Sequence, residues 1–218
     1  MRFRDIPQFT RTANYHVNVG WHHFEESLRY YVEQGLNLDP DFQRAHVWDD
    51  EKRRNYVEYI LKGGMSGKAV YMNCPDWNGS GRDDFVLVDG KQRVDAVLRF
   101  VRNELPIFDG HFYRDFTDSM DIVLASFNWY INDLDTRSEV LQWYLDLNSG
   151  GVMHTEEELG RVRALLEVEK ANPNPKDVAR AEAKMKWRAE REREREAARG
   201  KPDVYSPPLP RPRGRRRG

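Results

Sequence analysis

The chain has a single cysteine, Cys74, among its 218 residues, which excludes an internal disulfide and a cluster of cysteine metal ligands. Long apolar runs are missing as well. Residues 121–131, one of the most apolar stretches, are far shorter and more interrupted than the roughly 20 residues that a membrane-spanning helix needs. Arg2, Arg4 and Asp5 stand where a secretory signal has its apolar region. The sequence therefore predicts a soluble, cytoplasmic protein that does not bind a membrane.

Histidines are few and poorly spaced for metal binding. His22 and His23 are adjacent, so on a helix they point about 100° apart and do not chelate one ion together. His46 and His154 stand alone in the sequence. An imidazole in such a position can transfer a proton near neutral pH, although a lone loop histidine is more often exposed or hydrogen-bonded.

Length and charge indicate one domain with an appendage. With 39% apolar and 12% aromatic residues, the chain can bury one good core. Residues 171–218 contain 15 Lys and Arg against 7 Asp and Glu, which leaves 20 against 29 for residues 1–170. We therefore expect a folded, acidic domain at residues 1–170, a charged helical extension at 171–200 and a disordered Pro/Arg-rich tail at 201–218.

Hydrophobic spacing in the body mixes strands with helices, which is typical of an α+β fold. Strands are expected at residues 15–19, 69–72 and 85–88, with edge strands at 105–108 and 122–127. Helices are expected at residues 21–34, from Asp49 or Asp50 to Leu61, and at 90–102, 138–147 and 155–168.

Residues 86–96 are an apolar run that breaks at an Asp-Gly pair and restarts as a polar segment with helical spacing. This pattern predicts a strand, a tight turn and a helix start, which directs backbone N–H groups and the positive end of a helix at one point. Lys91 and Arg93 add cations there and Gln92 an amide, while Asp89 offers a carboxylate for a metal ion or a proton. The arrangement favours a phosphate site, although an ordinary turn with solvent-facing charges fits the same residues.

Two further segments accompany this turn. Residues 38–48 read Leu-Asp-Pro-Asp-Phe-Gln-Arg-Ala-His-Val-Trp and precede an expected helix. Residues 147–151 read Leu-Asn-Ser-Gly-Gly and precede a capping box from Thr155 to Glu158. With the three segments in this order, the chain resembles the ParB/sulfiredoxin-like family typified by the N-terminal domain of GmrSD-type restriction enzymes. The signatures of that family are P-x-F-Q-R-x-x-V-W, D-G-Q-Q-R and N-x-G-G, and the resemblance covers residues 38–159.

The resemblance implies a ParB/sulfiredoxin-like core with extra helices, and a pocket in which the three segments surround nucleotide phosphates. Arg44, Lys91 and Arg93 would clamp phosphoryl oxygens, with Asp89 as base or Mg²⁺ ligand and Gln92 orienting phosphate or water. The residues implied for chemistry are Asp89, Gln92 and Arg93, and those implied for binding the nucleotide are Gln43, Arg44, Gly90, Lys91, Asn148, Gly150 and Gly151.

Two residues depart from the family pattern. Lys91 replaces the first Gln of D-G-Q-Q-R, which adds a charge and removes an amide acceptor, and His46 stands where an aromatic residue is common. GmrSD-type enzymes also carry a separate His-dependent nuclease domain after this one. Since no histidine follows His154, we do not expect that second domain in this chain.

Related domains bind or hydrolyse nucleoside triphosphates, transfer phosphoryl groups, or are described as nucleases. The resemblance therefore implies a protein of bacterial or phage DNA metabolism or restriction that binds a nucleoside triphosphate and hydrolyses it with Mg²⁺, or cleaves nucleic acid. One alternative is a phosphotransferase that acts on a hydroxyl, including one on a modified DNA base. The other is a non-catalytic protein that senses a nucleotide. The oligomeric state stays open.

The C-terminal tail is the segment best suited to bind DNA or RNA. From residue 201 onward, six Lys and Arg accompany a single acid, Asp203. Such an arm attracts a phosphate backbone through counterion release, whereas the acidic body does not. The residues expected to contact nucleic acid are Arg211, Arg213, Arg215, Arg216 and Arg217. A solvated segment without a partner is the equally weighted alternative.

Overall fold

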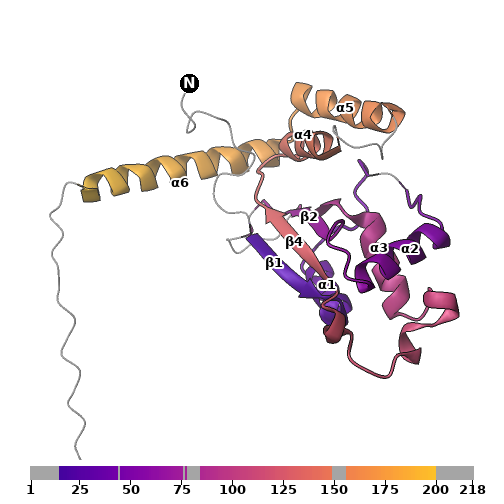
Figure 1. Ribbon diagram of the computed structural model, residues 1–218. Coiled ribbons are helices and arrows are strands. Elements are labelled where there is room, and N and C mark those ends of the chain that lie inside the picture. The colour runs from indigo at the N-terminus through magenta and orange to yellow at the C-terminus, as the bar shows by residue number, and fades with distance from the viewer. Residues whose placement is uncertain (1–14, 44, 76, 78–83, 149–155, 200–218) are drawn as a thin grey trace, which may run out of the picture. The chain divides into compact units, whose positions relative to one another are not determined.

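The computed structural model describes residues 15–43, 45–75, 77, 84–148 and 156–199, with side chains up to Glu194. These residues form an α+β fold, as the sequence predicts (Figure 1). The chain divides into two compact units, residues 1–178 and 179–218. None of the helices in the described ranges is long and apolar enough to cross a membrane.

A four-stranded mixed sheet forms the centre of the first unit. Its strands are β1 (Tyr15–Gly20), β2 (Ala69–Asn73), β3 (Val86–Asp89) and β4 (Ser126–Asn132), in the spatial order β1-β4-β2-β3. β4 pairs antiparallel with β1 and parallel with β2, and β2 pairs antiparallel with β3. The strand that leads into the Asp-Gly turn is therefore at one edge of the sheet.

The two expected edge strands are wrong. Residues 105–108 form no strand, because the backbones of Ile107 and His111 bond to each other at 2.8 Å and close the segment on itself. The strand expected at 122–127 begins only at Ser126, and β4 lies between β1 and β2 rather than at an edge. The apolar residues before it, Ile122 and Leu124, are exposed, so they did not indicate a buried strand.

Helices follow the expected order, with bounds that match or differ by at most three residues. They are α1 (Phe24–Glu33), α2 (Asp50–Leu61), α3 (Lys91–Val101), α4 (Arg137–Asn148), α5 (Glu156–Ala171) and α6 (Pro175–Arg199). A 3₁₀ turn, Trp21–His23, precedes α1. The Asp49 side chain caps α2 by accepting a hydrogen bond from the Lys52 N–H at 2.8 Å, because a short carboxylate satisfies a free N–H of the first turn.

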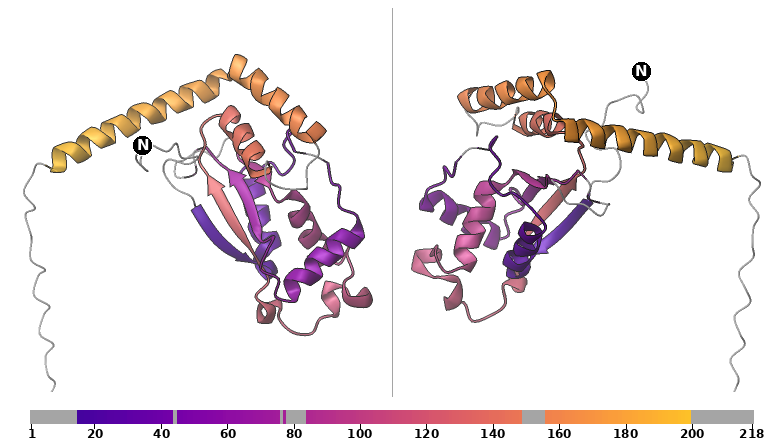
Figure 2. Two further views of the ribbon diagram at one scale, coloured as in Figure 1. Left: turned by 45° about the horizontal axis from the view of Figure 1, so that its top comes forward. Right: turned by 180° about the vertical axis from the view of Figure 1, so that it is seen from behind.

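Each face of the sheet packs against its own group of helices. The larger core joins α1, α2 and α3 to one face through residues such as Phe24, Val97 and Trp129. A second cluster, which includes Phe42 and Val88, packs α4 and α5 over the part of the other face near β3 (Figure 2). The turn between β3 and α3 thus lies where both layers meet the sheet edge.

Candidate functional site

The turn between β3 and α3 requires glycine at position 90. Gly90 has a φ of 111° and caps α3 in the left-handed conformation. A Cβ added there would lie 3.2 Å from Cγ2 and 3.3 Å from Cα of Val70. Both the backbone angle and this close approach disfavour any side chain. As a result, α3 starts without a side-chain cap, with the positive end of the helix at the turn.

Arg93 and Asp89, four residues apart, form an ion pair across the turn between β3 and α3. Both side chains are partly buried. The Nε of Arg93 is buried and meets no acceptor among the residues described. The pair lies beside Tyr71, whose Cα is opposite that of Asp89 in the β2–β3 register. Burial raises the pKa of Tyr71, the nearby Tyr130 and Asp89 raise it further, and Arg93 acts in the opposite direction.

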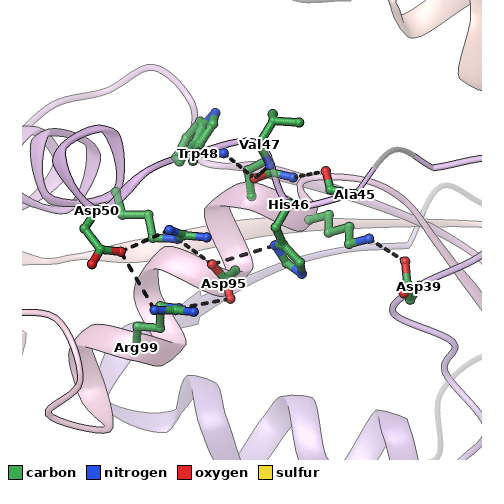
Figure 3. Close-up of polar contacts among 11 residues, drawn as sticks. Asp39, Ala45, His46, Val47, Trp48, Asp50, Asp95 and Arg99 are labelled. Atoms are coloured by element: carbon green, nitrogen blue, oxygen red, sulfur yellow. Dashed lines mark hydrogen bonds and ion pairs between the residues drawn. The ribbon is translucent and has the colours of Figure 1, made fainter. Parts of the chain in front are cut away.

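Lys91 binds a different carboxylate. Its ammonium group, although on a largely buried side chain, donates to Oδ1 of the exposed Asp39 (Figure 3). This hydrogen bond, followed by the positive charge of Lys91, holds the pKa of Asp39 below its usual value, and the charge of His46 acts in the same direction. The two cations of the expected phosphate site are thus held by two separate carboxylates.

Gln92 holds the loop at residues 45–48. Its Oε1 accepts hydrogen bonds from the N–H groups of Val47 and Trp48, both at 3.1 Å, and its Nε2 donates to the Ala45 carbonyl at 3.2 Å (Figure 3). An amide that binds backbone through both its oxygen and its nitrogen is well suited to fix a loop. Its expected contact with phosphate or water stays a prediction.

Gln43 plays a similar part at the outer edge of β3. Its Nε2 donates to the carbonyl of Leu87 at 2.5 Å, and the Arg161 guanidinium donates to the Gln43 carbonyl at 3.1 Å. Asn37 bonds to the backbone of Phe85 and Leu87 on the same edge. The segment 37–43 therefore covers the edge of β3 that leads into the turn.

Asn148, the last residue of α4, donates from its side chain to the Tyr144 carbonyl at 2.7 Å. The other expected binding residues, Arg44, Gly150 and Gly151, lie outside the residues that the structure describes, as do His154 and the five arginines of the tail. The structure thus brings Gln43, Gly90 and Lys91 to one edge of the sheet.

Metal binding at this site would depend on Asp89. Within the described part of the chain, no three His, Cys, Asp or Glu side chains come together as a metal site. Mg²⁺ commonly uses one or two protein carboxylates and takes its remaining ligands from phosphate and water. If Mg²⁺ binds at the turn, Asp89, which is paired with Arg93 in the structure, would be its carboxylate ligand.

Three neighbours of the turn were not expected to belong to the site. Asp39 lies inside the first signature segment, and its pairing with Lys91 depends on tertiary contact. Asp95 follows Lys91 by four residues, so it lies on the same face of α3, and this spacing was a usable signal. Nothing in the sequence indicated Tyr71.

An apolar cavity of about 140 Å³ lies elsewhere in the first unit. It is lined mainly by aromatic and aliphatic side chains, among them Leu61, Phe100 and Phe108. Phe100 is near the C-terminal end of α3, whereas Gly90 caps the N-terminal end. The cavity is thus separate from the turn, and its lining does not suit a phosphate.

The fold and the turn define a class of domain: a small α+β unit in which an edge strand leads through a left-handed glycine into an uncapped helix. The chain belongs to the family described as the GmrSD restriction endonuclease, N-terminal domain, whose model matches residues 27–165. The family resemblance of the sequence segments is thereby confirmed, and it connects the chain with restriction-related DNA metabolism. Neither a curated protein nor a solved structure matches the chain.

Proposed function

We propose that the turn between β3 and α3 binds the phosphates of a nucleoside triphosphate, and that the domain hydrolyses this nucleotide. The observation that supports this most strongly is the combination at the turn itself. Gly90 starts α3 at the turn without a side-chain cap, and the partly buried guanidinium of Arg93, paired with Asp89, lies one turn into the same helix. An anion with several oxygens would suit both the helix start and the guanidinium.

Binding would exchange the partners of the site. A phosphoryl oxygen can replace the Asp89 carboxylate on Arg93, because a guanidinium binds phosphate through paired donors. Asp89 is then free to hold Mg²⁺ between itself and the nucleotide. Charge that develops on the phosphoryl oxygens would be stabilised by Arg93, by Lys91 and by the helix start.

The family gives the reaction its context. Membership in the GmrSD N-terminal group connects the domain with restriction of DNA. Nucleic acid would be recruited separately by the basic tail, because residues 1–170 carry more acids than bases.

A second candidate is a nucleotide sensor without turnover. Lys91 and Arg93 both have a carboxylate partner, and Gln92 is bound by backbone at both ends of its amide. A site whose polar groups are already paired can respond to a nucleotide by releasing these contacts. In this case the loop held by Gln92 would be the element that moves.

The decisive experiment incubates the full chain with each of the four ribonucleoside triphosphates, with and without Mg²⁺. Binding is followed by calorimetry and hydrolysis by phosphate release. Release without an acceptor supports hydrolysis, and saturable binding without release supports the sensor. Turnover that needs an added hydroxyl acceptor, such as a hydroxymethylated DNA base, supports phosphoryl transfer. No binding of any triphosphate contradicts the proposal.

A further inference from the structure

His46 lies beside α3, opposite Asp95 (Figure 3). The loop that carries it is fixed to α3 by the hydrogen bonds from Val47 and Trp48 to Gln92. The imidazole Nδ1 is 3.7 Å from Oδ2 of Asp95 (Figure 3), and 45% of the side chain is exposed. One ring nitrogen thus faces a carboxylate, while the ring remains accessible to a ligand.

Asp95 is held firmly in this position. Its Oδ2 accepts from Nε of Arg53 at 2.7 Å, and its Oδ1 is 3.5 Å from Nε of Arg99. Arg53 is almost fully buried and also binds Asp50 at 3.1 Å. Because two arginines from α2 and α3 fix both oxygens, the carboxylate can orient a neighbouring imidazole without moving itself.

His46 and Asp95 lie next to the proposed phosphate site. Asp95 lies one turn after Lys91 on the same face of α3, and Lys91 begins the helix whose N-terminal end would face the phosphates of the proposed site. The charge of His46 also affects Asp39, the carboxylate that binds Lys91. A nucleotide whose terminal phosphate contacts Lys91 would therefore have His46 beside it.

We propose that His46 is the general base of the hydrolysis and that Asp95 is its positioning residue; this inference rests on the proposed function. Water attacks the terminal phosphorus as its proton passes to the imidazole nitrogen that does not face Asp95. An O–P bond forms, the bond from phosphorus to the bridging oxygen breaks, and the diphosphate leaves with that electron pair. The imidazolium returns the proton to solvent.

Several charged groups surround this imidazole and will shape the pH dependence of turnover. Asp95 of α3 faces it and is bound by Arg53 of α2 and Arg99 of α3, which both pair with Asp50 of α2. Asp39, which binds Lys91, interacts with the charge of the imidazole from the segment before the loop.

The test compares His46→Ala and His46→Gln with wild type at saturating nucleotide and Mg²⁺. We expect kcat to fall about 100-fold in both variants, while the dissociation constant for the nucleotide changes less than about threefold. His111→Gln is the matched control, because it removes an exposed histidine away from the turn and should keep the kcat of wild type.

Rescue separates a chemical role from a structural one. Added imidazole should restore at least a tenth of the lost turnover of His46→Ala and leave His46→Gln unchanged, because only the smaller side chain leaves room for the base. Rescue should increase with pH as the added imidazole loses its proton. Asp95→Asn should lower kcat less than His46→Ala does, at unchanged nucleotide affinity.

The outcomes that contradict the inference are distinct. If wild type hydrolyses a nucleotide and His46→Gln does so at a similar kcat, His46 is not the base, and the proposed function stands. If His46→Ala is slow but imidazole does not rescue it, the residue acts only on structure. If wild type binds nucleotides without any turnover, the proposed hydrolysis is wrong and the inference fails with it.

Discussion

Gln43 donates a hydrogen bond from its side chain to the backbone carbonyl of Leu87, 44 residues further along the chain, and both residues are buried. Leu87 also bonds through its N–H to Asn37 at 2.9 Å. The first signature segment therefore provides hydrogen-bond partners for backbone groups at the outer edge of β3. This edge lies immediately before the turn that the second signature forms. Gln43, which the family resemblance implies as a nucleotide-binding residue, thus also stabilises the fold through its contact with Leu87.

Replacing this side chain should destabilise the domain. Gln43→Ala leaves the buried Leu87 carbonyl without its amide donor, which costs about 1–3 kcal/mol of the free energy of unfolding. Urea unfolding followed by tryptophan fluorescence measures the loss. Gln142→Ala is the control, because Gln142 is exposed and its contact with Asp146 within α4 contributes little. Equal stability of the two variants would show that the Gln43 contact does not matter.

Arg93→Ala should weaken nucleotide binding by about tenfold or more, because it removes the paired donors best placed for a phosphate. Calorimetric titration with a nonhydrolysable triphosphate measures this effect. Arg102→Ala, at the other end of α3, removes an exposed ion pair with Glu25 and should keep the affinity. A lower melting temperature of Arg93→Ala at unchanged affinity would make Arg93 a structural ion-pair residue.

Asp89→Asn should separate binding from turnover. The amide keeps the shape of the side chain but loses the charge that holds Arg93 and is needed for Mg²⁺. We expect the affinity for the nucleotide to stay equal or to increase, while Mg²⁺-dependent phosphate release falls by about 100-fold, the scale of a lost catalytic group. Turnover that keeps its rate and its metal dependence would remove Asp89 from the mechanism.

The pair of Lys91 and Asp39 predicts a pH-dependent part of the stability. The pKa of Asp39 is lower in the folded chain than in the unfolded one. The pair therefore stabilises the fold fully at pH values above the pKa of Asp in the unfolded chain, about 3.9. This contribution is lost as the pH falls from there through the folded pKa. Asp39→Asn should thus lower the melting temperature at pH 7 and make a smaller difference at pH 3. A difference that is the same at both pH values would contradict the prediction.

Ending the chain at Gly200 should lower the affinity for DNA or RNA at low salt and flatten the salt dependence of binding, because six cations are removed. Hydrolysis of a free nucleotide should hardly change. Exchanging the five tail arginines for lysine keeps the charge and should keep most of the affinity. If the shortened chain binds nucleic acid as well as the full chain, a surface of the folded body is the binding site instead.

Local features of the sequence were sufficient for most of the elements. The apolar run before Asp89, the glycine and the polar helical segment predict β3, the turn and α3 without knowledge of any contact, because propensity and spacing act over a few residues. The same holds for α2, whose start at an Asp cap was expected. The family could also be recognised, because its three signatures are short and contiguous.

Tertiary structure alone decided which partner each site residue has. Lys91 and Arg93 are two positions apart and were expected to face one point, yet they bind carboxylates at positions 39 and 89. The central place of β4 depends on pairing with β1 and β2, more than 50 residues away, and no local spacing encodes it. His46 and Asp95 meet only because Gln92 holds their loop and helix together, and such contacts between distant segments form when the core packs.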